Sequence, residues 1–185
     1  MITSTMFLLS ICVSILLTLS SSTSALNILV HSPAYAASHT NFMARLADTL
    51  TQAGHNVTFL VPIAVEARRD KLGVEETKDV IIVEQDEEMK RLLKPTTGSI
   101  EFLWIIEMDS SSIDTMLNWY NEIMELTCAN FMRNQKVLAE LKSRHFDVAI
   151  AEPFTICGLG ILEELNIDKT ILVSSCVHYD FMLPH

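Results

Sequence analysis

Residues Ile28–Pro62 read ILVHSPAYAASHTNFMARLADTLTQAGHNVTFLVP, and this stretch decides the fold. It opens with an apolar, β-branched run that predicts a strand ending near His31. From Ser38 to Ala53, apolar residues recur at intervals of three and four, which predicts an amphipathic helix with Gly54 as its C-terminal stop. The apolar positions of that helix are Phe42, Met43, Leu46, Ala47, Leu50 and Ala53. The closing run, NVTFLVP, predicts a second strand.

The rest of the chain continues this alternation of short apolar runs and helical segments. The runs predict three more strands, over residues 79–85, 146–153 and 168–176. The helical segments are a short one over 64–73, a long region over 86–144 and one over 155–166. Such alternation indicates an α/β fold, a Rossmann-like doubly wound sheet of parallel strands with helices on both faces. Ligands of such sheets bind at the carboxyl ends of the strands.

The composition limits the function classes. The 185 residues are 49% hydrophobic, enough for one domain with a substantial core and too few for two large ones. The chain has 13 basic residues against 23 acidic ones, for a net charge of −10, and no basic cluster stands apart from acids. These features argue against a nucleic-acid partner, which requires a basic surface.

The first 25 residues have the pattern of a secretory signal peptide. They contain no Lys, Arg, Asp or Glu, and their apolar core, MFLLSICVSILLTL, is short for a bilayer span. Small residues at Thr23 and Ala25 suit cleavage before Leu26. We therefore expect a signal peptide over residues 1–25 and a soluble mature domain over 26–185 in the secretory pathway. An uncleaved anchor is the lesser alternative.

The mature chain contains three cysteines, Cys128, Cys157 and Cys176, whose spacing is not that of a metal site. An odd count without a disulfide-type pattern favours buried thiols. An oxidising compartment also allows one bridge, and the pair that the predicted fold brings to mind is Cys157 with Cys176.

The first strand-to-helix turn excludes the commonest ligands of such sheets. A dinucleotide needs a glycine-rich turn there, so that the backbone can approach the pyrophosphate. This turn reads HSPAYAASH and has no glycine, and the chain has no GxxxxGK[ST] sequence. Both the NAD-type and the P-loop interpretations therefore fail at their most specific element.

His39 lies in the first turn of the predicted helix. The positive end of the helix dipole disfavours the protonated imidazole and keeps a basic nitrogen available near pH 7. A general base also needs a partner that stabilises the imidazolium, and Glu152, at the end of the fourth strand, is the candidate. Spacing alone leaves open the alternative that His39 caps the helix and Glu152 is a surface acid. The other histidines are weaker candidates: His31, His55, His145, His178 and His185.

Four features in order carry a family resemblance. They are the apolar leader, the Ile28–Pro62 stretch, LTCANFMRNQKVLAELKSRHFDVAIAEPFTICG at 126–158 and LNIDKTILVSS at 165–175. Together they resemble the amino-terminal half of the membrane-bound UDP-glycosyltransferases, the UDP-glucuronosyltransferase group. The resemblance covers essentially the whole mature chain.

The resemblance implies a GT-B architecture, with two Rossmann-like halves. The first half would hold a small lipophilic acceptor, and the second would hold the UDP-sugar, a co-substrate rather than a cofactor. Residues 26–185 would then be a truncated N-terminal, acceptor-binding domain. The donor-binding half, with its HGG signature, and the carboxy-terminal membrane helix are expected outside this sequence.

The resemblance also assigns roles to two residues. His39 matches the histidine that deprotonates the acceptor hydroxyl, whose oxygen then attacks the anomeric carbon of the sugar with inversion. Glu152 stands where the family has an aspartate, in FDVAIAEPF, and would orient His39 across one additional methylene. Ala37 stands where the family often has glycine, a milder departure.

Two hypotheses for the function are consistent with these features. In the first, the chain is a fragment of an enzyme that transfers glucuronic acid or glucose from a UDP-sugar to a lipophilic acceptor. In the second, it is a catalytically inactive binding module, secreted or in the lumen of the endoplasmic reticulum. Such a module would bind the acceptor alone or modulate full-length relatives, so a homo- or hetero-oligomer stays open. The sequence of the transcript beyond the codon for His185 discriminates between the two hypotheses.

Overall fold

The computed structural model describes residues 24–93, 110–153 and 156–175. Its sheet is parallel throughout, with the strand order β3-β2-β1-β4-β5. The strands are β1 (Asn27–His31), β2 (Asn56–Pro62), β3 (Asp79–Val83), β4 (Val148–Ala151) and β5 (Thr170–Leu172). This order confirms the predicted α/β fold. It places β1 between β2 and β4, where the direction of winding reverses and where such sheets bind ligands.

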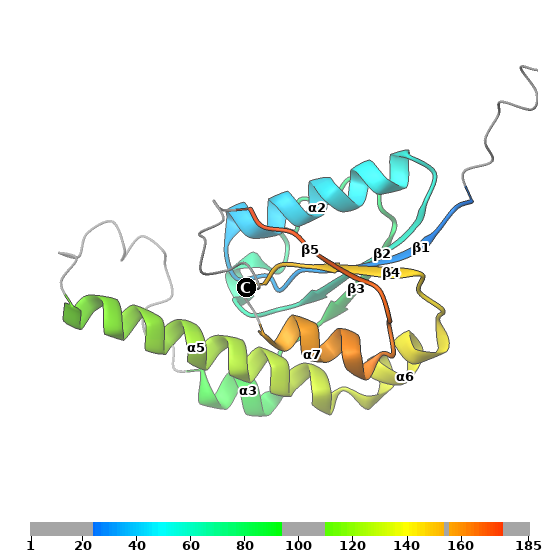
Figure 1. Ribbon diagram of the computed structural model, residues 1–185. Helices are drawn as coiled ribbons and strands as arrows, with labels where there is room; N and C mark the ends of the chain where they lie inside the picture. The colour runs from blue at the N-terminus through cyan, green and yellow to red at the C-terminus, as the bar shows by residue number, and fades with distance from the viewer. Residues whose placement is uncertain (1–23, 94–109, 154–155, 176–185) are drawn as a thin grey trace, which may run out of the picture.

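Helices cover both faces of the sheet (Figure 1). One face carries α2 (Ala37–Gln52), and the other carries α5 (Ser110–Arg133) and α7 (Ile156–Glu164). Two shorter helices, α3 (Glu87–Leu92) and α6 (Gln135–Ser143), lie with α5 on that second side. No helix within the described ranges combines the length and the apolar character that crossing a bilayer requires.

Alternating side chains of the strands build a separate core on each face. Ile28 and Val30 of β1 point toward α2, where they pack with Met43, Ala44 and Ala47. Leu29, between them, points to the other side and packs with residues of α5, α6 and α7, namely Phe131, Leu138, Leu141, Ile161 and Leu162. Successive strand residues face opposite sides of a sheet, so the nearly continuous apolar strands reflect burial on both faces.

Helix α2 begins and ends one residue before the predicted bounds, with Ala53 as its C-cap. Gly54 follows it with φ of 90°, a left-handed conformation that favours glycine. The buried stripe includes Met43 and Ala47, whereas the Phe42 side chain is 38% exposed and lies at the edge of the stripe.

Two predicted helical segments differ from the structure. The segment 64–73 forms only one 3-10 turn (Glu66–Arg68), held by bonds three residues apart such as Arg69 N–H to the carbonyl of Glu66. None of the three residues of this turn is buried, so packing does not favour a longer helix. The described parts of the region 86–144, residues 86–93 and 110–144, form the helices α3, α5 and α6. Residues 94–109 lie outside the described residues.

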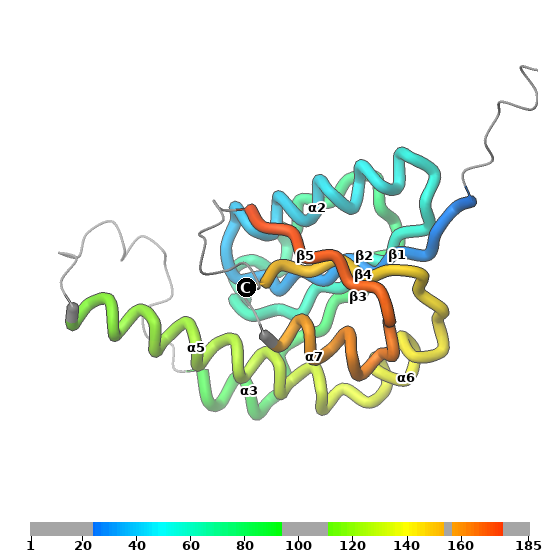
Figure 2. The backbone as a smooth tube through the Cα atoms, viewed as in Figure 1, coloured from blue at the N-terminus to red at the C-terminus, as the bar shows by residue number. Residues whose placement is uncertain are grey.

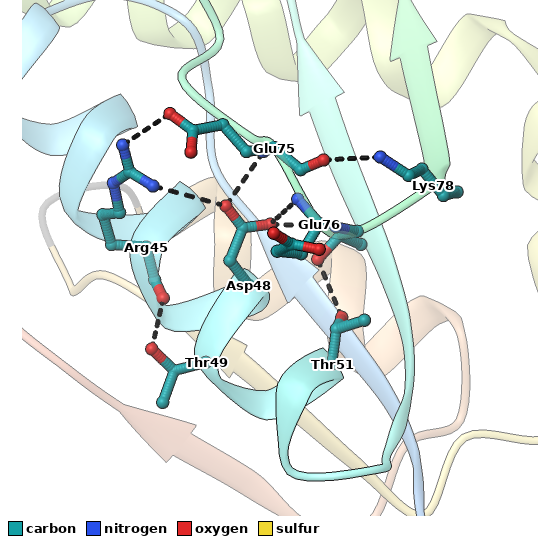
Figure 3. Close-up of polar contacts among 8 residues, drawn as sticks. Arg45, Asp48, Thr49, Thr51, Glu75, Glu76 and Lys78 are labelled. Atoms are coloured by element: carbon teal, nitrogen blue, oxygen red, sulfur yellow. Dashed lines mark hydrogen bonds and ion pairs between the residues drawn. The ribbon is translucent and has the colours of Figure 1, made fainter.

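A buried carboxylate ties α2 to the segment that enters β3 (Figure 3). Asp48, 3% exposed, accepts backbone N–H hydrogen bonds from Glu75, Glu76 and Thr77, each at 2.9 Å. Burial alone would raise the pKa of Asp48, but these three donors hold it below its ordinary value. The network fixes the outer part of the sheet against the helix that carries His39.

Candidate active site

The fold brings His39 and Glu152 together, as predicted. Helix α2 starts above the carboxyl end of β1, and Glu152 directly follows β4, the neighbour of β1 in the sheet. His39 Nδ1 lies 2.9 Å from Glu152 Oε2, across 113 residues of sequence. Their side chains are only 14% and 9% exposed. This contact excludes the alternative in which Glu152 is a surface acid.

The electrostatics of the pair determine which nitrogen of His39 is basic. Burial alone would raise the pKa of Glu152, but hydrogen bonds from His39 and Ser175 hold it below its ordinary value. An ionised carboxylate only accepts hydrogen bonds, so the hydrogen of a neutral imidazole lies on Nδ1 and is donated to Oε2. The other ring nitrogen, Nε2, is then the basic atom.

Ser175, which sequence reasoning did not single out, completes the polar cluster. Its backbone N–H donates to Glu152 Oε1 at 2.9 Å, and its Oγ lies 3.0 Å from His39 Nδ1. Figure 2 shows why, because the described residues that follow β5 lie beside the start of α2. Parallel strands end at one edge of a sheet, so the serine that follows β5 was open to prediction by the rule that gave Glu152.

One tyrosine lies beside the imidazole, and a second packs against the first. The ring of Tyr35 is 4.9 Å from the His39 ring, and Tyr120 of α5 lies edge-on to Tyr35 at 5.8 Å. Burial raises the pKa of Tyr120, so its hydroxyl is neutral at physiological pH. Both rings adjoin a small apolar cluster formed by Ala64, Ile123 and Met124. From the sequence, the apolar residues at helical spacing in this part of the chain favour core packing, with a wall for an apolar ligand as the lesser alternative. The contact of Tyr120 with Tyr35 brings one of these residues close to the site.

A second histidine, His31, is buried close to this edge of the sheet. It is 2% exposed, and neither ring nitrogen has a hydrogen-bond partner within the described residues. Burial lowers the pKa of His31 to about 4, so it is neutral near pH 7. It faces a cavity of about 10 Å³ lined by Met124, Thr127 and Ile161, among others, which is room for one water molecule.

The cysteines are paired differently from the prediction. Cys128 of α5 and Cys157 of α7 form a disulfide, so they are neither buried thiols nor a Cys157–Cys176 bridge. Cys176 lies outside the described residues. The prediction was wrong because the expected fold did not show that α5 and α7 cover the same face of the sheet, where they bring Cys128 and Cys157 together. No cluster suited to a metal ion occurs in the part of the chain that the structure describes.

Comparisons with known proteins agree on one family. The family model described as UDP-glucoronosyl and UDP-glucosyl transferase matches residues 27–182. A Caenorhabditis elegans protein whose name places it among the UDP-glucuronosyltransferases, ugt-56, is 33% identical over 153 residues. Human UDP-glucuronosyltransferase 3A2 is 29% identical over 150 residues. The two alignments cover 82% and 80% of this chain.

Solved structures show the same fold. TcCGT1 in complex with UDP has a TM-score of 0.51 at 14% identity, over 83% of this chain and 29% of that one. Phytolacca americana UGT2, complexed with UDP-2fluoro-glucose and pterostilbene, has a TM-score of 0.50 at 14% identity, over 82% of this chain and 31% of that one. The chain thus has the fold of one part of a GT-B glycosyltransferase.

The chain spans only part of these proteins. It covers 29% of the length of ugt-56 and 28% of the human protein. The family match nevertheless extends over residues 27–182, including both His39 and Glu152. The chain therefore belongs to the UDP-glucuronosyl and UDP-glucosyl transferase family.

Proposed function

We propose that the chain is the acceptor-binding part of an enzyme that transfers a sugar from a UDP-sugar to a hydroxyl group. The observation that carries this proposal is the 2.9 Å contact between His39 and Glu152. It occurs at the carboxyl edge of the sheet, where such folds bind ligands. The sugar is proposed to be glucuronic acid or glucose, after the family description.

In this mechanism His39 Nε2 accepts the proton of the acceptor hydroxyl. The acceptor oxygen forms a bond to the anomeric carbon of the sugar from the face opposite the UDP, and the bond from that carbon to the UDP oxygen breaks. The configuration is therefore inverted. Glu152 stabilises the imidazolium that forms and keeps the Nδ1–H tautomer oriented.

The surroundings of His39 support a lipophilic acceptor. Tyr35 and Tyr120 supply aromatic surface beside the imidazole, and Met124 and Trp119 lie in or against the same cluster. Aromatic side chains bind apolar ring systems by offset or edge-on packing. A charged acceptor would lose hydration here without gaining an ion pair in return. Glu152 is the only ionised group of the described site, and its two carboxylate oxygens already accept hydrogen bonds from His39 and Ser175.

The location proposed for the protein is the secretory pathway, with the lumen of the endoplasmic reticulum as the compartment. The Cys128–Cys157 disulfide supports this location, since disulfides persist in oxidising compartments. Residues 1–23 of the predicted signal peptide lie outside the described residues. Protease protection of the protein in sealed microsomes tests this proposal, and cleavage without detergent would contradict it.

The transfer reaction is tested with the protein expressed from the complete transcript that encodes this chain. Phenol is the acceptor, UDP-glucuronic acid and UDP-glucose are the donors, and the glycoside is measured by chromatography. We expect His39→Ala to lower kcat by about 100-fold or more, the range for loss of a general base. His145→Ala, a change at an exposed histidine, is the matched control.

Unchanged turnover in His39→Ala would contradict the assigned role. Acceptor binding without turnover for either donor would favour the alternative function, an inactive binding module.

A further inference from the structure

We propose that Ser175 is the third member of the His39–Glu152 pair, a positioning residue that fixes the carboxylate and thereby selects the reactive tautomer of His39. The inference rests on the proposed function for its catalytic meaning, but its geometry stands independently. Ser175 contacts both members of the pair, through Oε1 of Glu152 and Nδ1 of His39.

The first contact, from the Ser175 N–H, restricts the conformational freedom of the Glu152 side chain. Glu152 has three rotatable bonds, and ordering such a side chain costs about 1–2 kcal/mol of conformational entropy. The Ser175 N–H donates to Oε1, while His39 donates to Oε2. The two oxygens of the carboxylate are therefore each held by a separate donor, and the plane of the carboxylate is fixed.

The second contact involves the serine hydroxyl. Together with the backbone N–H, the hydroxyl lowers the pKa of the Glu152 carboxyl group, as expected of a donor directed at the carboxylate. Its Oγ, 3.0 Å from His39 Nδ1, can then receive a second branch of the Nδ1–H bond. The hydroxyl can donate to Glu152 only if that carboxylate is ionised, and it can accept from His39 only if the imidazole carries its hydrogen on Nδ1. Both interactions therefore require the same protonation pattern.

The consequence concerns the basic nitrogen. If the carboxylate turned away, the imidazole could carry its hydrogen on Nε2, and that nitrogen would have no lone pair for the acceptor proton. Ser175 opposes this tautomer through Glu152 Oε1 and His39 Nδ1, not through Nε2, the nitrogen that accepts the proton. It also lies just after β5, so it couples the geometry of the pair to the edge of the sheet.

The test measures the tautomer directly. The protein is labelled with ¹⁵N-histidine, and the two nitrogen shifts of His39 are read by NMR without donor or acceptor. The wild type is expected to hold the Nδ1–H form predominantly. Ser175→Ala keeps the backbone N–H but loses the hydroxyl, and we expect the ratio of Nδ1–H to Nε2–H to fall by about tenfold, the effect of one hydrogen bond to a charged group.

The controls separate positioning from general structure. Ser175→Thr keeps the hydroxyl and should restore the tautomer ratio. Ser143→Ala removes an exposed hydroxyl at the end of α6 and should leave the ratio unchanged. The carboxyl titration of Glu152, followed by ¹³C NMR, should move to higher pH in Ser175→Ala and return in Ser175→Thr.

An unchanged ratio in Ser175→Ala, or an equal loss in Ser175→Thr, would overturn the proposal. A shifted ratio in a protein that shows no transfer activity would instead overturn the proposed function and leave the positioning role intact. In the active protein, Ser175→Ala should lower kcat by about tenfold with little change in KM, because the assigned role is to position His39 and Glu152 and not to bind the acceptor.

Discussion

The imidazole of His39 and the carboxylate of Glu152 lie 2.9 Å apart, although 113 residues separate them in the chain. The parallel pairing of β1 with β4 brings them together, since the two residues lie beyond the ends of adjacent strands. The contact is direct and nearly buried, so the charge on Glu152 acts on His39 with little screening by water. This pair determines the chemistry expected of the site, whereas three other buried features determine how the fold responds to acid, mutation and reduction.

The charge and the length of Glu152 can be tested separately. Glu152→Gln keeps the shape but removes the charge that stabilises the imidazolium, and we expect kcat to fall by about 100-fold. Glu152→Asp keeps the charge but shortens the reach to Ser175 and His39, and we expect a loss of about tenfold or less. Steady-state kinetics on the complete protein measure both. Equal activity in Glu152→Gln and the wild type would show that the charge has no role.

His31 should make the fold sensitive to acid. Its pKa is about 4 in the folded chain and near 6.5 when exposed, so the unfolded chain binds the additional proton between these values. Stability should therefore decrease as the pH falls from 6.5 to 4, by about 3 kcal/mol in total.

Urea denaturation across this pH range, monitored by circular dichroism, measures the effect. His31→Leu removes the titrating group, so its stability should fall less steeply over the same range. The exposed variant His145→Leu is the control and should behave as the wild type. Identical slopes in His31→Leu and the wild type would contradict the prediction.

Asp48 should contribute to stability through its three backbone donors. Asp48→Ala leaves the N–H groups of Glu75, Glu76 and Thr77 without their acceptor, and we expect a loss of about 2–4 kcal/mol. Asp70→Ala, at an exposed aspartate, should change stability by about 0.5 kcal/mol or less.

The carboxylate of Asp48 also makes part of the folding stability depend on pH. Its pKa is lowered in the folded chain, so its contribution is present above the unfolded value of 3.8 and is lost as the pH falls through the folded value. Chemical denaturation of Asp48→Ala and Asp70→Ala, at neutral pH and at a pH below the unfolded pKa of 3.8, compares their free energies of unfolding. A loss in Asp48→Ala no larger than that in Asp70→Ala would refute the assigned role.

The disulfide between Cys128 and Cys157 should stabilise the helical layer that covers His31. Cysteines 29 residues apart close a loop whose entropy in the unfolded chain corresponds to about 3–4 kcal/mol. A reducing agent and the double variant Cys128→Ser/Cys157→Ser should lower the urea midpoint by similar amounts. Peptide mapping without reduction should recover the linked pair, and a Cys157–Cys176 peptide would contradict the assignment.

Much of the fold was open to prediction from the sequence. The five strands and α2 result from continuous apolar runs and from a regular helical stripe ended by Gly54. The segment 64–73 was predicted as a helix because its composition is helical, but composition does not report that none of its side chains in the 3-10 turn are buried. The apolar residues at helical spacing along α5 predict a buried face, but only part of that face is buried. Leu117 is 49% exposed, whereas Phe131 is fully buried.

The site residues could be predicted where they follow strands directly, because the carboxyl ends of parallel strands meet at one edge of the sheet. This rule gave His39 and Glu152 but was not applied to Ser175, whose strand is short and exposed on both faces. The Cys128–Cys157 pair and the contact of Tyr120 with Tyr35 depend on how α5 crosses the sheet. Packing of helices set far apart in the chain leaves no local pattern in a single sequence.

The central claim is that His39 removes the acceptor proton, and the dependence of the His39→Ala defect on acceptor acidity tests it most directly. The complete protein and the variant are compared with two acceptors: cyclohexanol, which must lose its proton during transfer, and a nitrophenol already ionised at the assay pH. The account predicts a loss of about 100-fold or more with cyclohexanol and a much smaller loss with the nitrophenolate. Equal losses with both acceptors would contradict it, because His39 would then act in binding or structure rather than as the base.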